Sequence, residues 1–352
     1  MEPIESPVRT GGVSDVDAVT EPMRRWIASV DNIDALSRYA ADAAAVTGVL
    51  MAGGVGALAT CRALTGLHDA LTVRLIELAE AQLGPAPCRY AWLALGSGGR
   101  MEQSLCTDQD HAIAYADDGA PDRYFGALGA HVVAGLARAG LRRCPGGYMA
   151  DRWHLPLARW REVFRGWVES PEPLALVEAE LLLDFRRVAG ELSPVPLDAV
   201  LRSGSAAPRF LVGMARAAVR FPPSLRFGLI RGEHGEVDLK RGGLAGVVLL
   251  ARLYALSAAS LARATPDRLA AASAAGTISL EGAAVLADAY RFLAELRLRA
   301  QLRQVADGIE PTNRVRLADL TADERKRLRR VLKTVRELQR STELRFHTHT
   351  VL

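Results

Sequence analysis

The stretch of sequence that decides the fold is a glycine-rich segment that ends in two acidic residues, Gly96-Ser-Gly-Gly-Arg-Met-Glu-Gln-Ser-Leu-Cys-Thr-Asp-Gln-Asp110. It follows the apolar run Tyr90 to Leu95 and leads into a second apolar run that ends at Tyr115. Short apolar runs bounded by glycine or polar residues are typical of buried strands. The order of strand, loop and strand predicts a small sheet domain that carries the loop and the acids.

The first half of this segment suits phosphate binding. The glycines of Gly96-Ser97-Gly98-Gly99 let the backbone approach a phosphate closely, and successive N–H groups form an anion-binding nest. A helix that begins near Arg100 would add the positive end of its dipole. The Ser97 hydroxyl is a further donor, and Arg100 is a candidate phosphate clamp. Taken alone, such a segment is usually only a turn.

The second half suits metal binding. Because residues i and i+2 of a strand point to one face, Asp108 and Asp110 can bind one metal cluster while Gln109 points away. Carboxylates suit Mg²⁺, which takes a few of them together with substrate phosphates. Two such ions stabilise both the attacking and the leaving oxygen. An isolated Asp-x-Asp is usually a solvated strand end, so the prediction of a nucleotide site depends on the loop and the acids together.

The rest of the chain reads as helical, so the predicted fold class is α+β and mostly helical, with a small mixed sheet flanked by helical bundles. We expect a flexible tail over residues 1–20, an N-terminal helical domain over 21–85, the sheet domain over 86–190 and a C-terminal helical domain over 191–352. The last domain is expected to contain a short hairpin at 224–241, with its turn at residues 231–235.

Several elements within these domains follow from the pattern. We expect a helix from Pro121 to Arg138, a third strand from Gly146 to Ala150, and long helices over 286–305 and 323–345. Apolar residues at helical spacing are expected to form core, and these are Leu67, Leu71, Leu75, Leu78, Trp160, Phe164 and Trp167.

The composition excludes several classes of protein. The chain has 352 residues and a formal net charge of +4, and only three of its basic residues are lysines, which is typical of a GC-rich genome. No basic stripe is interleaved with aromatic residues, so we expect no nucleic-acid partner. The four cysteines are widely spaced, which argues against structural zinc and a disulfide framework.

We expect neither a signal peptide nor a membrane span. Met1 to Thr20 carries acids and has no apolar core. Residues 43–61 carry no charge, but Gly53, Gly54 and Gly56 favour a turn between two buried helices over a membrane span. The chain is therefore expected to be cytoplasmic.

With its motifs described, the sequence is seen to resemble a known family. Residues 92–110 are similar to the nucleotidyltransferase-like family known as domain of unknown function 294, whose relatives include PII-protein uridylyltransferase and glutamine-synthetase adenylyltransferase. Further similar segments are residues 144–150, 237–244, 253–256 and 296–301, so the resemblance covers nearly the whole chain. It implies a nucleotidyltransferase fold flanked by helical bundles.

The resemblance also implies roles for individual residues. Gly96 and Ser97 would contact the triphosphate, and Asp108 and Asp110 would hold Mg²⁺. Arg100 and Glu102 are fixed members of the motif, and Glu102 is expected to orient the loop through Arg100.

A second motif implied by the resemblance is the turn formed by Lys240, Gly242 and Gly243, which both better-known enzymes share. A lysine and free N–H groups at the start of a helix would make a second phosphate contact. The alternative is a hairpin end that leads into a helix. Ala245 and Gly246 stand where the two enzymes have an Arg-Asp pair, so this chain departs from their pattern there.

A third acid is the missing piece of this site. Enzymes of this superfamily often place one on the next strand, and the nearest candidate here is Asp151, which could instead cap the following turn. His111 follows the acid pair but is expected to point away from Asp110, so we assign it no catalytic role.

The sequence leaves three functions open. The leading hypothesis is an enzyme that uses Mg²⁺ (or Mn²⁺), as two ions, to move NMP (UMP or AMP) from an NTP to an acceptor. By the resemblance, the acceptor is a protein side chain. The second is a nucleotide-binding signalling module that senses without catalysis, and the third is a helical scaffold with a vestigial site. The partners implied are an NTP and a protein acceptor or regulatory partner, and a homodimer is left open.

Overall fold

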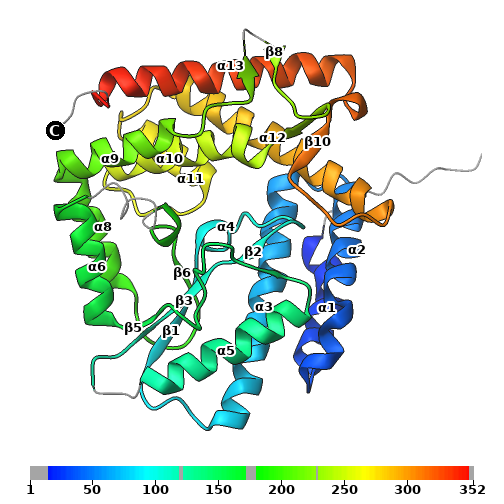
Figure 1. Ribbon diagram of the computed structural model, residues 1–352, viewed down its shortest axis with the longest axis vertical. Coiled ribbons are helices and arrows are strands. Elements are labelled where there is room, and N and C mark those ends of the chain that lie inside the picture. The colour runs from blue at the N-terminus through cyan, green and yellow to red at the C-terminus, as the bar shows by residue number, and fades with distance from the viewer. Residues whose placement is uncertain (1–14, 119–121, 172–179, 227–228, 349–352) are drawn as a thin grey trace, which may run out of the picture.

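The computed structural model describes residues 15–118, 122–171, 180–226 and 229–348. Most of the described chain is helical, and a small four-stranded mixed sheet lies between the N-terminal and C-terminal helices (Figure 1). This arrangement confirms the prediction of an α+β, mostly helical fold.

The sheet has the strand order β5-β3-β1-β6. Its two central strands are β1 (Tyr90–Ala94) and β3 (His111–Tyr115), the two apolar runs of the sequence, and they pair antiparallel. β6 (Arg186–Ala189) pairs antiparallel with β1, and β5 (His154–Pro156) pairs parallel with β3. The glycine-rich segment therefore connects two neighbouring central strands.

Both faces of the sheet are covered, as the alternation of side chains along a strand requires. Trp92 and Ile113 point to one face, where they pack with α3 (Ala57–Leu83) and α5 (Asp122–Arg138). Leu93 and Ala112 point to the other face, in the core that α6 (Leu157–Glu169) and the C-terminal helices share. The sheet thus has no solvent-facing side, and its functional groups lie at the ends of its strands.

The N-terminal helices are α1 (Val16–Ser29), the 3₁₀ helix η1 (Ile33–Arg38), α2 (Tyr39–Ala52) and α3. Because α1 begins at Val16, after its cap Asp15, the expected tail does not extend to residue 20, and residues 1–14 of that prediction lie outside the described residues. The uncharged stretch 43–61 runs from α2 through a turn at Gly53 and Gly54 into α3, as predicted. Among the described residues, no helix combines the length and the apolar character that a membrane span requires.

The C-terminal half consists of further helices. They are α8 (Val195–Ser203), η2 (Gly204–Ala206), α9 (Pro208–Val219), α10 (Ala245–Ser257), α11 (Thr265–Ala274), α12 (Leu280–Ala306), η4 (Leu317–Asp319) and α13 (Ala322–Arg345). The two predicted long helices are α12 and α13. Trp160, Phe164 and Trp167 on α6 are buried, which confirms them as core.

Two predicted elements are wrong. Residues 146–150 form turns, with the N–H of Gly147 donating to the carbonyl of Cys144 and that of Met149 to Gly147, and the strand comes later as β5. The predicted hairpin is also paired differently. β7 (Leu225–Arg226) pairs with β8 (Leu229–Ile230), whereas β9 (Glu236–Asp238) pairs with the distant β10 (Arg314–Arg316). A partner so far along the chain leaves no local sign in the sequence.

Candidate nucleotide site

The glycine-rich segment is itself a single helical turn, α4 (Gly96–Gly99), so the helix expected to begin near Arg100 begins four residues earlier. The N–H groups of Gly99, Arg100 and Glu102 donate to the carbonyls of Leu95, Gly96 and Ser97. A single turn of helix leaves its first N–H groups, those of Gly96, Ser97 and Gly98, without partners inside the turn.

Two of these glycines are required by the structure. Gly96 has φ +51°, and a Cβ there would lie 2.7 Å from Leu181 Cδ1. A Cβ on Gly99 would lie 1.7 Å from the carbonyl oxygen of Asp184, so the loop backbone packs directly on the segment before β6. Gly98, in contrast, would place a Cβ only in ordinary contact, 3.5 Å from the Ala94 side chain.

Arg100 and Glu102 form the expected pair, with Arg100 Nε donating to Glu102 Oε2 at 2.6 Å. Arg100 also donates through Nη1 to Asp184 Oδ2 at 2.5 Å, so two carboxylates already pair with the guanidinium that we expected to clamp phosphate. Glu102 in turn accepts from the N–H of Thr265, at the start of α11. The pair therefore fastens the loop to the C-terminal helices, and Arg100 acts on the loop as well as lining the site.

Asp184, which was not selected from the sequence, is fully buried at the centre of a charge cluster. Besides Arg100, it accepts from Arg252 of α10 and from Arg268 of α11. Burial alone would raise the pKa of Asp184, but the three guanidiniums outweigh it and hold the pKa well below its usual range. Burial lowers the pKa of Arg268 to about 10. One carboxylate thus joins the loop to two helices of the C-terminal half.

The acid pair lies as the alternation along the strand predicts. Asp108 belongs to β2 (Asp108–Gln109), which pairs parallel with β4 (Arg142–Arg143). The Gln109 side chain is buried and donates to the carbonyl of Leu141 at 2.9 Å, away from both acids. The backbone carbonyl of Asp110 accepts from the N–H of Leu95, so the acid is fixed against the start of the loop.

Cations surround Asp108. Its carboxylate lies 3.3 Å from Arg142 Nη2 and 3.6 Å from Lys240 Nζ. Lys240 begins the π-helical turn η3 (Lys240–Leu244) of the C-terminal half. The structure therefore brings the lysine of the second motif directly to the first acid of the first motif.

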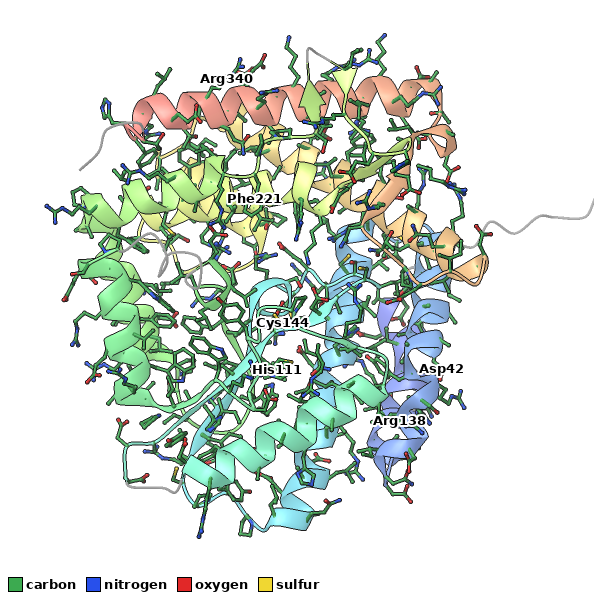
Figure 2. All side chains as sticks on the ribbon, viewed as in Figure 1. Asp42, His111, Arg138, Cys144, Phe221 and Arg340 are labelled. Atoms are coloured by element: carbon green, nitrogen blue, oxygen red, sulfur yellow. The ribbon has the colours of Figure 1, made fainter. Side chains whose placement is uncertain are left out.

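Asp110, like Asp108, is partly buried. Burial raises the pKa of Asp110, and a hydrogen bond from Cys144 together with the charge of Lys240 partly offsets that rise. Figure 2 labels Cys144 and His111, the next residue after Asp110, near the middle of the molecule. Among the side chains that the structure describes, no group of three or more His, Cys, Asp or Glu is placed to hold a metal ion.

The donor set nevertheless fits Mg²⁺. Two carboxylates on one side of a strand end are what this ion takes from a protein when substrate phosphates and waters complete its shell. Asp110 Oδ2 lies beside the loop, 3.4 Å from the position that a Cβ on Gly96 would take. Asp108 and Asp110 would hold the metal, and Asp108 would then exchange its ion pairs with Lys240 and Arg142 for the metal ion.

The third acid and the histidine lie elsewhere. Asp151 is in a turn, and its carboxylate pairs with Arg143 Nη2 at 3.4 Å. His111 Nδ1 accepts from the N–H of Ala150, and burial lowers the pKa of His111 to about 3. His111 is therefore neutral and buried, and its hydrogen bond with the Ala150 N–H supports the fold.

A cavity of about 270 Å³ lies beside the loop and the Lys240 turn. Its polar lining residues are Ser97, Arg100, Glu102, Ser104, Thr107, Glu180, Lys240, Tyr290 and Arg297, and its apolar ones include Leu181, Phe221, Leu244, Val248 and Leu249. Asp108 and Asp110 lie next to this cavity without lining it, and with Gly98 they line a small neighbouring one of about 30 Å³. Ser97, Arg100 and Lys240 are thus brought together in one cavity.

Arg297 of α12 is a cavity residue to which we assigned no role from the sequence. Its side chain is only 8% exposed, and its Nε has no hydrogen-bond partner among the described residues. An unpaired polar atom on a buried cation is costly unless a ligand pairs with it. The sequence signal was its place in the family-like segment 296–301, which did not by itself indicate a ligand.

Gly242 and Gly243 are packed against neighbouring side chains and do not line the cavity. A Cβ on Gly242 would lie 1.9 Å from Ser224 Oγ, and the Gly242 carbonyl accepts from the Ser224 N–H. A Cβ on Gly243 would lie 3.1 Å from Leu293 of α12. These glycines hold the turn that presents Lys240.

Two family models match the chain. The model described as "Putative nucleotidyltransferase DUF294" matches residues 41–174, and the one described as "Putative nucleotidyltransferase substrate binding domain" matches residues 208–346. A comparison with curated proteins found no match. The sheet, the loop with its acids and these two models define a protein of the nucleotidyltransferase class. The chain belongs to the DUF294 family, in agreement with the resemblance seen in its sequence.

Proposed function

We propose that the protein transfers NMP from a metal-bound NTP to an acceptor and releases pyrophosphate. The observation that carries the proposal is the position of Lys240, which lies 3.6 Å from Asp108 and lines one cavity with Ser97 and Arg297. A loop, an acid pair and cations from a distant part of the chain are the groups that nucleotidyl transfer needs.

The cavity suits a nucleotide because it has a polar and an apolar side. Ser97, Lys240 and Arg297 would bind the triphosphate, together with the N–H groups of Gly96 and Gly98. The apolar side chains of Phe221, Val248 and Leu249 would receive the base. Because these apolar groups carry no base-specific donor or acceptor, we propose UTP or ATP as the substrate without choosing between them.

The metal is Mg²⁺ or Mn²⁺, as two ions held by Asp108 and Asp110. When bound, it would supply charge that stabilises the attacking and leaving oxygens. Lys240 pairs with Asp108 across a distance longer than a hydrogen bond, so its half-exposed ammonium is free to move to a phosphate. Arg100 and Glu102 hold the loop in place for that exchange.

The acceptor is a protein side chain in this proposal. The support is the family's relationship to two protein-modifying enzymes and the description of the second domain as substrate binding. The acceptor would approach from the C-terminal half, which also contributes Lys240 and Arg297.

The experiment is label transfer from each NTP to proteins of a host lysate in Mg²⁺ or Mn²⁺. Wild-type protein should transfer label from UTP or ATP, and an Asp108→Asn/Asp110→Asn variant should not. Equal labelling by wild type and double variant would refute the assigned acids.

A second function is favoured by the position of Asp151, whose carboxylate pairs with Arg143 and does not lie beside the acid pair. Such a site could bind a metal-bound NTP as a sensor and pass the signal to a partner. The departure at Ala245 and Gly246 supports the same alternative. Tight NTP binding by wild type, without label transfer or pyrophosphate release for any NTP, would establish the sensor and exclude the transferase.

A further inference from the structure

A second cavity, of about 450 Å³, lies on the other side of residues 105–107 from the nucleotide cavity. Its walls come from α2 and α3, from the turn before β4, and from the segment that follows α12. In Figure 1 this last segment extends beside the N-terminal helices. Cys106 and Thr107 line both cavities, so the two share a wall.

The lining of this second cavity is mostly apolar. Leu64, Leu105, Leu141 and Ile309 contribute to it, with several alanines of α2. Among its described lining residues the charged ones are Arg142 and Glu310, 3.9 Å apart, and His68 is neutral because burial lowers its pKa to about 4. The lining therefore suits a ligand that is largely apolar and carries one charged group.

Two buried polar atoms of lining residues add to this picture. The Tyr39 hydroxyl and His68 Nδ1 have no hydrogen-bond partner among the described residues. Both side chains are more than nine-tenths buried, and their rings lie 5.7 Å apart. Buried polar groups are normally paired, so unpaired ones beside a cavity indicate that a bound molecule or water completes them.

Arg142 connects this cavity to the nucleotide site. Its Nη2 lies 2.9 Å from Cys106 Sγ and 3.3 Å from Asp108 Oδ1, while Nη1 faces Glu310. Its side chain is 44% exposed, against 75% for Glu310, so Arg142 is the less hydrated of the two charges. An anionic ligand in the cavity would compete with Glu310, which is 3.9 Å from Nη1 and largely exposed, for this guanidinium.

We propose that this second cavity binds a small apolar monocarboxylate whose carboxylate pairs with Arg142 and draws that cation away from Asp108. Binding in this cavity would then leave Asp108 with Lys240 alone and make it a better metal ligand. The binding site stands on the cavity and its lining. The effect on Asp108 rests on the proposed function, because it takes Asp108 as a metal ligand.

The first test measures binding to the full chain by ligand-observed NMR and calorimetry. The probes are phenylacetate, 4-methylpentanoate and octanoate, each compared with its uncharged amide. At least one carboxylate should bind at least tenfold more tightly than its amide, and Arg142→Met should remove that difference. Arg143→Met is the matched control, because Arg143 is the next residue and pairs with Asp151.

A second pair of variants tests the cavity without touching a charge. Ala41 and Ala45 are both exposed on α2, and only Ala41 lines the cavity. Ala41→Phe should abolish carboxylate binding, and Ala45→Phe should leave it unchanged, with equal thermal unfolding of the two. Absence of binding by all three carboxylates, or equal binding by the Ala41→Phe and Ala45→Phe variants, would overturn the proposed site.

The link to Asp108 is tested by Mn²⁺ binding, followed by electron paramagnetic resonance without nucleotide. A bound carboxylate should tighten Mn²⁺ binding several-fold, and Arg142→Met should do so without any carboxylate. Carboxylate binding that leaves Mn²⁺ affinity unchanged would overturn the link while keeping the site. Loss of nucleotidyl transfer with both binding results intact would instead count against the proposed function.

Discussion

Asp184 is a buried carboxylate that forms ion pairs with three arginines. Its carboxylate is fully buried, and it accepts hydrogen bonds from the guanidinium groups of Arg100, Arg252 and Arg268. Removing one partner of a buried ion pair costs about 3–5 kcal/mol, because the other charge stays buried without compensation. We predict that Asp184→Asn lowers the free energy of unfolding by about that amount.

The measurement is urea unfolding at neutral pH. Asp288→Asn is the control, since Asp288 pairs with Arg327 at the surface and should lose less than about 1 kcal/mol. Because the pKa of Asp184 lies well below its usual range, its contribution is present above the ordinary Asp pKa and lost as pH falls below it. Equal effects of the two substitutions would show that the cluster does not hold the fold.

For Asp110 we predict that replacement by asparagine stabilises the folded chain at neutral pH, whereas Asp184→Asn destabilises it. Burial raises its pKa in the folded chain, so ionisation of Asp110 destabilises the fold, and the full penalty is present above that raised value. The penalty is absent below the ordinary Asp pKa and grows as the pH rises through the interval between the two values. We predict that Asp110→Asn raises the thermal unfolding midpoint at pH 7, leaves it nearly unchanged at pH 3.5 and abolishes Mn²⁺ binding. A lower unfolding midpoint of Asp110→Asn at pH 7 would show that the ionised carboxylate does not destabilise the folded chain.

Arg297 is predicted to bind the triphosphate. Hydrogen bonds between charged groups contribute about 1.5–3 kcal/mol, so Arg297→Met should weaken NTP binding roughly 10- to 150-fold. Titration with a fluorescent NTP analogue measures this. Arg299→Met, on the same helix and paired with Glu324, should bind like wild type. Unchanged affinity in Arg297→Met would remove the residue from the site.

At the scale of elements, the loop depends on the segment before β6. A Cβ on Gly99 would meet the Asp184 carbonyl at 1.7 Å, whereas one on Gly98 would make only ordinary contacts. Forcing atoms into a packed site costs about 1–3 kcal/mol. We predict that Gly99→Ala loses at least that much stability and that Gly98→Ala loses none, by thermal unfolding of both. Equal stability of the two variants would mean that the loop does not pack there.

The elements differ in how well the sequence alone predicts them. The short apolar runs predicted β1 and β3, and the alternation of side chains along a strand predicted that Gln109 points away from the acids, because both features are local in the sequence. β9 could not be paired correctly, since its partner Arg314–Arg316 lies far along the chain. Asp184 and Arg297 could not be selected either, because a charged residue gives no sign in a single sequence that tertiary packing buries it.

At the scale of the whole molecule, the first family model ends before the sheet does. Its match stops at residue 174, and β6, which pairs with β1, lies at residues 186–189. We predict that a fragment of residues 41–174 shows no cooperative thermal unfolding, because it leaves an edge of β1 unpaired and its core open. A chain of residues 15–348 is the control and should unfold cooperatively. Cooperative unfolding of the short fragment would show that it is an independent unit.

The charge cluster around Asp184 can form only after two distant arginines have been synthesised. Arg252 and Arg268 follow Asp184 by 68 and 84 residues. At about 5–20 residues per second, a ribosome needs roughly 4–17 s to add the second arginine after the aspartate. Until then the aspartate lacks two of its three arginine partners, so we expect it to stay hydrated. We therefore expect the nascent chain to be open to proteases and chaperones during that interval, after the glycine-rich loop has been made and before the helices that hold it have emerged.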